Sequence, residues 1–193
     1  MPATPTKRRN HADSLRYTAP HCTPQASRPG SPVKNLLGSA SRMVANAKYV
    51  HTNLIARDWR SLARFYQDVF GCVPVPPERD YAGPDLEAGT GVPDASLQGV
   101  HLRLPGHCPN GPTLEVFHYS ELASEVERAV NRPGFGHIAF SVASVRQARA
   151  EVLTHGGSSV ADIVNLTTAT GSRVTWCYVA DPEGNVIELQ SWS

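Results

Sequence analysis

The sequence predicts an α+β fold of two βαβββ modules, because one pattern of strand, helix and further strands occurs twice. A strand-like segment opens each copy and carries a histidine, His51 in YVHTNLIA and His137 in FGHIAFSV. Each copy closes with an apolar strand that carries one glutamate, Glu115 in PTLEVF and Glu188 in NVIELQ. Two such modules side by side would form a curved eight-stranded mixed sheet, with the helices on its convex face and its concave face free for a ligand.

An amphipathic helix follows the first strand of each copy. Apolar residues recur at helical spacing and predict helices over Trp59–Phe70 and Val145–His155. Asp58 and Ser144 stand seven residues after their histidines, and both residue types favour the N-cap position of a helix. The two copies therefore agree in where their helices begin.

The two copies also agree in where the helices end and in which strand face they cover. Gly71 and Gly157 stand twenty residues after the histidines and suit the left-handed residue that ends a helix. Alternation along the first strands predicts that the apolar residues face the helix and the histidines face the other way. The residues expected beneath the helices are Leu54, Ile138, Phe140 and Val142.

The remaining segments complete each module. Pro74–Gly99 is rich in Pro, Gly and Asp, and we expect one strand there with flanking loops that shape or cover a site. Hairpins are predicted over 100–119 and 173–190, the second with its turn at Asp181–Asn185. Glu121–Arg132 is expected to be a helical linker, because its apolar residues are four apart.

Charge and composition divide the chain into a tail and one domain. Residues 1–46 hold seven Lys or Arg and one acid, a net charge of +6, whereas the remainder carries −5. The tail is rich in Pro and Ser and lacks a core pattern, so it is predicted to be disordered. The predicted domain is 47–193, and it divides into module one (47–120), a linker (121–133) and module two (134–193).

Several classes of protein are disfavoured. The basic tail lacks the aromatic or glycine interleaving expected of a nucleic-acid arm, and no apolar run is long enough to span a bilayer. The cysteines are scattered without a CxxC motif and are expected to be reduced thiols of a cytoplasmic protein: Cys22, Cys72, Cys108 and Cys177. An organelle transit peptide is the alternative for the Arg-rich, Ser-rich, acid-poor tail.

Two imidazoles and two carboxylates at equivalent positions of a repeat indicate a metal site. His51, Glu115, His137 and Glu188 would form it if the two modules face one another. Such a set without thiolate suits Zn, Ni, Co, Mn or Fe as a divalent ion with open positions for water. The alternative is that each is an isolated polar residue of a strand, which the pairing in both copies disfavours.

Other residues of metal-binding or aromatic type receive weaker assignments. Four lie in or beside the first hairpin and are set aside as surface or outward-facing groups: His101, His107, Cys108 and His118. Trp176 and Tyr178 share one face of the strand paired with that of Glu188. We expect them to bind substrate, with core aromatics of the sheet as the alternative.

The ligand set predicts a chemistry. A metal that chelates two adjacent substrate oxygens acidifies the C–H beside the carbonyl by stabilising a metal-bound enediolate. A carboxylate in the same site can take that proton and return it to the neighbouring carbon. Either Glu115 or Glu188 could serve as this base. The expected substrate is a small α-hydroxycarbonyl or thioester-type molecule.

Three motifs resemble the vicinal oxygen chelate superfamily: HTNLIARDWRSLARFYQDVFG, GHIAFSV and DPEGNVIEL. Within it, residues 48–193 are most similar to glyoxalase I, the lactoylglutathione lyase. The resemblance implies the glyoxalase/bleomycin-resistance-like fold, a metal-dependent lyase or isomerase, and Glu188 as the base with Glu115 as the second ligand. Non-catalytic small-molecule-binding or resistance proteins and metal-dependent dioxygenases of the same superfamily are the alternatives.

Two further expectations concern substrate and assembly. Glutathione-using members commonly carry a basic residue four positions after the first ligand, and Ile55 stands there in this chain. The resemblance therefore implies a substrate other than the glutathione hemithioacetal. A homodimer is expected, and the modules could pair either within one chain or across the dimer.

Overall fold

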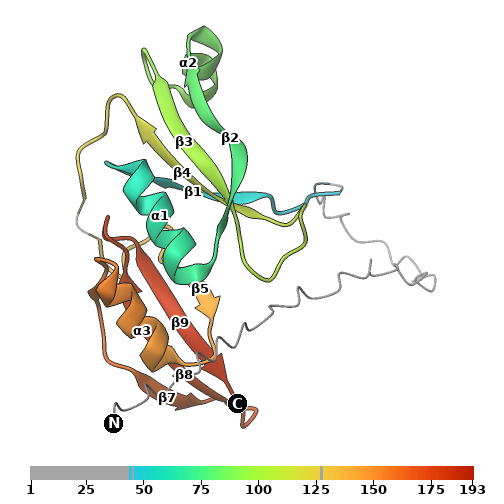
Figure 1. Ribbon diagram of the computed structural model, residues 1–193, viewed down its shortest axis with the longest axis vertical. Coiled ribbons are helices and arrows are strands. Elements are labelled where there is room, and N and C mark those ends of the chain that lie inside the picture. The colour runs from blue at the N-terminus through green and yellow to red at the C-terminus, as the bar shows by residue number, and fades with distance from the viewer. Residues whose placement is uncertain (1–43, 45, 127) are drawn as a thin grey trace, which may run out of the picture. The chain divides into compact units, whose positions relative to one another are not determined.

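The structure of the chain is a computed structural model that describes residues 44, 46–126 and 128–193. It contains helices and strands in the order expected for two βαβββ modules, which confirms the predicted α+β class (Figure 1). The predicted disordered tail lies outside the described residues, apart from residues 44 and 46.

Module one is a four-stranded sheet with a helix packed on one face. Its elements are β1 (His51–Ile55), α1 (Trp59–Phe70), β2 (Val73–Ala82), α2 (Pro84–Thr90), β3 (Ser96–Arg103) and β4 (Thr113–Tyr119). The strand order is β1-β4-β3-β2, with β1 parallel to β4 and the other pairs antiparallel. The segment Pro74–Gly99 therefore supplies the expected strand and also a short helix that the sequence did not predict.

Module two repeats this topology. Its elements are β5 (Ile138–Ser141), α3 (Val145–Thr154), β6 (Ser158–Ser159), β7 (Val164–Thr167), β8 (Arg173–Ala180) and β9 (Val186–Trp192). Its sheet runs β5-β9-β8-β6, and β7 also pairs with β8. The two short strands β6 and β7 together take the place that β2 has in module one. The first strand is again parallel to the last.

Both predicted helices are present, and side chains cap both N-termini. The Asp58 carboxylate accepts hydrogen bonds from the backbone N–H groups of Arg60 and Ser61, at 3.1 and 3.0 Å. The Ser144 hydroxyl accepts one from the Gln147 N–H at 3.3 Å. These bonds satisfy N–H groups that have no partner within the helix, so the predicted starting points are confirmed.

The helix ends follow the prediction in one copy only. Gly71 adopts the left-handed conformation with φ 70° and ends α1 as expected. In module two the left-handed residue is Gly156, with φ 87°, so the assignment to Gly157 is wrong by one position. Gly157 has another constraint: a Cβ there would lie 2.5 Å from the carbonyl oxygen of Ala180. Close approach to β8 therefore requires this glycine.

The linker between the modules is not helical over its described residues, 121–126 and 128–132, so that prediction is wrong. Its apolar side chains remain 41% (Leu122), 60% (Val126) and 43% (Val130) exposed. An isolated short helix is marginal in water unless an apolar face packs against something. The exposure of these three side chains shows that they do not pack as one buried apolar face.

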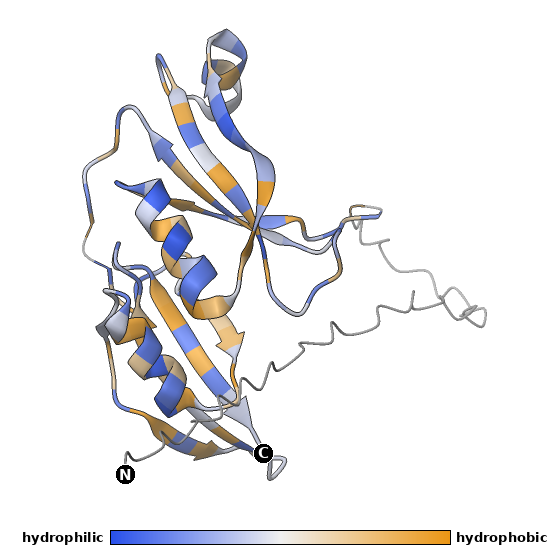
Figure 2. Ribbon diagram, viewed as in Figure 1, coloured by the Kyte–Doolittle hydropathy of each residue, from blue (hydrophilic) through white to orange (hydrophobic). Residues whose placement is uncertain are grey.

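The sheets of the two modules are separate, whereas the sequence led us to expect one continuous sheet of eight strands. Within the described residues, β1 and β5 are edge strands of different sheets and do not pair with one another. The modules meet through their helices and a shared core, in which the rings of Phe70 and Phe140 stack with centroids 4.0 Å apart. Apolar and polar residues alternate along β3 and β9 (Figure 2), so each sheet buries one face.

The cysteines divide into two kinds. Cys72 and Cys177 are buried free thiols, as expected. Cys108 is disulfide-bonded, so the prediction of a reduced thiol is wrong there. Disulfide formation depends on distance in space, which scattered spacing along the chain does not reveal. Cys22 lies outside the described residues. No helix in the described part of the chain has the length and apolar character needed to cross a membrane.

Candidate functional site

The first predicted pair is in contact in module one. His51 begins β1, and its Nδ1 lies 3.2 Å from Oε1 of Glu115 on the parallel neighbour β4. The pairing register places Asn53 directly beside Glu115, and the histidine two residues earlier on the same face. The Glu115 residue is only 7% exposed. A buried carboxylate requires hydrogen-bonding partners.

Two further side chains supply such partners to Glu115. His101 lies directly opposite it in the β3–β4 ladder, and its Nε2 is 3.3 Å from Oε1. The Asn53 amide donates to Oε2 at 3.3 Å. Burial lowers the pKa of His101, although the Glu115 charge acts in the opposite direction. The carboxylate is thus held from both sides, by imidazoles at one oxygen and an amide at the other.

The second predicted pair is in contact in module two. Nε2 of His137, the residue before β5, lies 3.2 Å from Oε2 of Glu188 on β9. Tyr178 stands opposite Glu188 in the β8–β9 ladder, with its ring 5.1 Å from that of His137. The ring of Trp176 lies 5.0 Å from that of Tyr178. Burial, and secondarily the Glu188 charge, raises the pKa of Tyr178, which keeps the phenol protonated.

The register shows that the two pairs are equivalent. Asn53 is the β1 partner of Glu115, and Ala139 is the β5 partner of Glu188. Across the hairpin, His101 takes in module one the position that Tyr178 takes in module two. The modules therefore share a histidine and a glutamate but differ in the two residues that flank the glutamate.

Sequence reasoning missed His101, and a signal was present. Tyr178 stands ten residues before Glu188, whereas His101 stands fourteen before Glu115 because the first hairpin has a longer loop. When the longer loop of the first hairpin is taken into account, His101 stands opposite Glu115 just as Tyr178 stands opposite Glu188. His118 was rightly set aside, because its Nδ1 bonds to the Ala56 carbonyl oxygen at 2.9 Å on the other face of the sheet.

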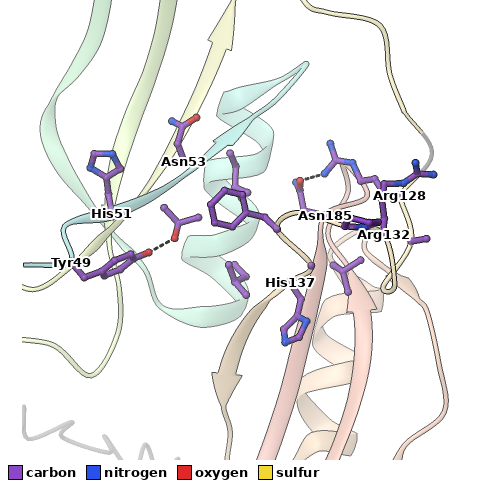
Figure 3. Close-up of a pocket in the computed structure, with 15 residues that line it drawn as sticks. Tyr49, His51, Asn53, Arg128, Arg132, His137 and Asn185 are labelled. Carbon is purple, nitrogen blue, oxygen red and sulfur yellow. Dashed lines mark hydrogen bonds between the residues drawn. The ribbon is translucent and has the colours of Figure 1, made fainter. Parts of the chain in front are cut away.

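The two pairs remain apart within the chain. A pocket of about 520 Å³ is lined by His51 from β1 and by His137 beside β5, but by neither glutamate. Figure 3 shows the two imidazoles on different walls, with their rings pointing in different directions. Among the described residues, no three His, Cys, Asp or Glu side chains are arranged to hold a metal ion. The two His–Glu pairs therefore lie at separate places in the described chain.

The fold and the paired residues can be compared with known proteins. The sequence profile of the Glyoxalase/Bleomycin resistance protein/Dioxygenase superfamily matches residues 48–189. The chain belongs to this superfamily. The match begins just before β1 and ends within β9, so it spans both His–Glu pairs.

Solved structures of superfamily proteins share the fold at low sequence identity. A glyoxalase family protein from Bacillus cereus is 16% identical, with a TM-score of 0.60, over 80% of this chain and 99% of that one. A domain from Frankia sp. EAN1pec is 16% identical, with a TM-score of 0.53, over 76% and 98%. The trypanothione-dependent glyoxalase I of Leishmania major is 21% identical, with a TM-score of 0.50, over 75% and 86%. The comparison with curated proteins found no match.

Members of the superfamily commonly use divalent metals, and the donor atoms of the two His–Glu pairs are of types that such ions bind. The donors are imidazole nitrogens and carboxylate oxygens, which suit borderline divalent cations. Among the ion pairs of the described residues, Glu115 and Glu188 have only histidines as partners, and neither pairs with Lys or Arg. A divalent cation would supply the positive charge that these largely buried carboxylates lack.

Proposed function

We propose that this chain is a metal-dependent lyase or isomerase of the glyoxalase type. It would move a proton at a C–H beside the carbonyl of a small α-hydroxycarbonyl or thioester-type substrate. The observation that carries the proposal is the His–Glu pair at the same register position of each module, with a contact of 3.2 Å in both. Polar residues without a shared role would not be expected to form the same His–Glu contact at the same register position of both modules.

The proposed metal ligands are His51 and Glu115 from module one and His137 and Glu188 from module two. A divalent ion held there would act as a Lewis acid toward the negative charge that develops beside a carbonyl when its C–H loses a proton. The metal affinity of the wild-type chain tests this directly. The double variant His51→Ala with Glu188→Gln should lose stoichiometric divalent metal while keeping its circular dichroism. One tight metal per site in that variant would exclude this ligand set.

The side chains of module two are proposed to carry the proton transfer. Glu188 takes the proton from the substrate carbon and returns it to the neighbouring carbon, with Glu115 as the fixed second ligand. The Tyr178 phenol, which stays protonated, can donate a hydrogen bond to a substrate oxygen. Trp176 would form an apolar wall beside it, since its ring packs against Tyr178.

We further propose that a homodimer completes the site. Among the described residues, the two pairs belong to separate sheets, and β1 and β5 are edge strands of those sheets. Apolar side chains beside these edges are largely exposed, including Tyr49, Val50 and Phe135. A second copy could cover them and bring module one of one chain against module two of its partner.

Mixed dimers distinguish this assembly from pairing within one chain. One chain carries His51→Ala with Glu115→Gln, and the other carries His137→Ala with Glu188→Gln. If the site spans two chains, each mixed dimer regains one intact site, and co-expression restores metal binding and turnover. If each site lies within one chain, every site keeps a damaged half and nothing is restored. Each variant alone provides the control.

The substrate is proposed to differ from the glutathione hemithioacetal. Ile55 shares a strand face with His51 and Asn53 and is 41% exposed, so an apolar surface stands where glutathione-using relatives place a basic residue. An assay with methylglyoxal and glutathione tests this, with Ile55→Arg as the comparison. Slow conversion by the wild type and faster conversion by the variant would support the proposal. Efficient conversion by the wild type would contradict it.

A further inference from the structure

The glutamates of the two His–Glu pairs occupy equivalent positions but have different surroundings. The Glu115 carboxylate contacts His51 and His101 through Oε1 and Asn53 through Oε2. Within the described residues, the Glu188 carboxylate has one such contact, with His137. The Glu115 side chain is 10% exposed, and that of Glu188 is 19% exposed. The structure therefore restrains one carboxylate more than the other.

The difference arises at two positions of the repeat. Where module one has Asn53, module two has Ala139, which has no polar side-chain atom to offer Glu188. Where module one has His101, module two has Tyr178, which has no side-chain hydrogen bond to Glu188 in the described structure. The ring of His101 is itself held, since it meets Phe117 edge-on with centroids 5.7 Å apart.

We infer that His101 is a positioning residue for Glu115. Together with the Asn53 amide, its imidazole holds the carboxylate in one orientation, so that Glu115 acts as a fixed ligand while Glu188 remains free to move. This inference rests on the proposed function, since it concerns the ligand role of Glu115. Groups that orient a metal ligand reduce the freedom it must lose on binding and commonly affect metal affinity 10–100-fold.

The test replaces the imidazole with a ring of similar size that has no N–H. In the full-length chain, His101→Phe should weaken Zn²⁺ binding roughly 10–100-fold in competition with a chelator. The matched control is His107→Phe, the same change at an exposed histidine in the loop of the same hairpin. The conservative variant His101→Gln keeps a side-chain N–H and should recover part of the affinity.

Two readouts separate positioning from general structural damage. The visible absorption of Co²⁺ bound to His101→Phe should differ from that of the wild type, because the orientation of a ligand has changed. Turnover of His101→Phe should recover at saturating metal, since Glu188 is untouched. A crystal structure of the variant should show the Glu115 carboxylate rotated. If His101→Phe does not fold, His101→Leu provides the same comparison, because leucine also has no side-chain N–H.

The outcomes distinguish the inference from the proposed function. Metal binding by the wild type with a selective loss in His101→Phe supports both. Equal affinities and equal Co²⁺ spectra for the wild type and His101→Phe would overturn the inference and leave the proposed function standing. Failure of the wild-type chain to bind any of the divalent ions would overturn the proposed function, and the ligand role of Glu115 with it.

Discussion

The hydroxyl of Tyr66 donates a hydrogen bond of 2.9 Å to the carboxylate of Asp181. The bond joins α1 of module one to the turn between β8 and β9 of module two. Both residues are buried, at 0% and 2% exposure. Backbone and side-chain N–H groups of the turn satisfy the remaining carboxylate sites. Burial raises the pKa of Asp181, although these hydrogen bonds act in the opposite direction.

Removal of this hydroxyl should destabilise the domain. Tyr66→Phe keeps the ring in the shared core but leaves a buried carboxylate one donor short, at a cost of about 1–3 kcal/mol in the free energy of unfolding. Urea denaturation of the wild type and the variant measures this difference in the free energy of unfolding. Tyr81→Phe is the control, because Tyr81 lies on β2 with about half of its surface exposed. Equal losses in both variants would show that the bond between modules contributes nothing specific.

The buried thiol of Cys72 should make stability depend on pH in the alkaline range. Burial raises its pKa from an ordinary value of 9.0 to about 12. The folded state therefore favours the protonated thiol, so this contribution is complete below pH 9 and is lost as the pH rises toward 12. In that window the wild type should lose up to about 1.4 kcal/mol per pH unit relative to Cys72→Ala.

Urea unfolding of both proteins at about pH 8 and about pH 11 checks this expectation. The cavity in Cys72→Ala costs the same at both pH values, so only the difference between the two proteins matters. A difference that is unchanged between the two conditions would show that folding does not raise the pKa of this thiol.

Gly99 should not tolerate a side chain. A Cβ at this position would lie 2.2 Å from both the Val116 carbonyl oxygen and a ring carbon of Phe117. Gly99→Ala must therefore separate β3 from β4 beside His101, and we expect a loss of about 1–3 kcal/mol. Gly89→Ala in α2 is the control, because no atom lies within 4 Å of its added Cβ. The control should be neutral or slightly stabilising. Thermal unfolding of both variants decides the comparison.

Glu188→Gln should separate turnover from metal binding. The amide has nearly the same shape as the carboxylate but is no base, so turnover should fall roughly a hundredfold or more. Metal should remain bound at reduced affinity, because three proposed ligands persist. Single-turnover kinetics with metal at saturation measures the chemical step. Glu115→Gln is the matched variant, and it should affect metal affinity more than Glu188→Gln does. The reverse order would assign the base to Glu115.

Local chemistry explains which parts of the fold could be predicted. Asp58 and Ser144 mark helix starts because their side chains bond to N–H groups only two or three residues away. Strand parity placed Leu54 toward the helix and His51 on the opposite face, since successive side chains alternate. The rule that a glycine ends a helix gave the wrong residue at Gly157. This glycine is required by its close approach to β8, and not by the end of the helix.

The candidate site depended on more than local pattern. The contacts of His51 with Glu115 and of His137 with Glu188 follow from the repeat, and the sequence alone was enough to pair them. The contact of His101 with Glu115 follows from hairpin register, which the length of the connecting loop changes from one module to the other. The register of the β3–β4 hairpin was therefore known only from the structure.

The sequence by itself determined the two modules, their helices and the residues of each His–Glu pair, because all of these depend on neighbours along the chain. Only the tertiary structure decided that the sheets are separate, that the linker is not helical and that Glu115 is held from both sides. These features arise from contacts between residues far apart in sequence, such as Tyr66 with Asp181. The packing energies that favour such contacts depend on how side chains fit together in three dimensions. The periodicity of the sequence therefore does not predict these contacts.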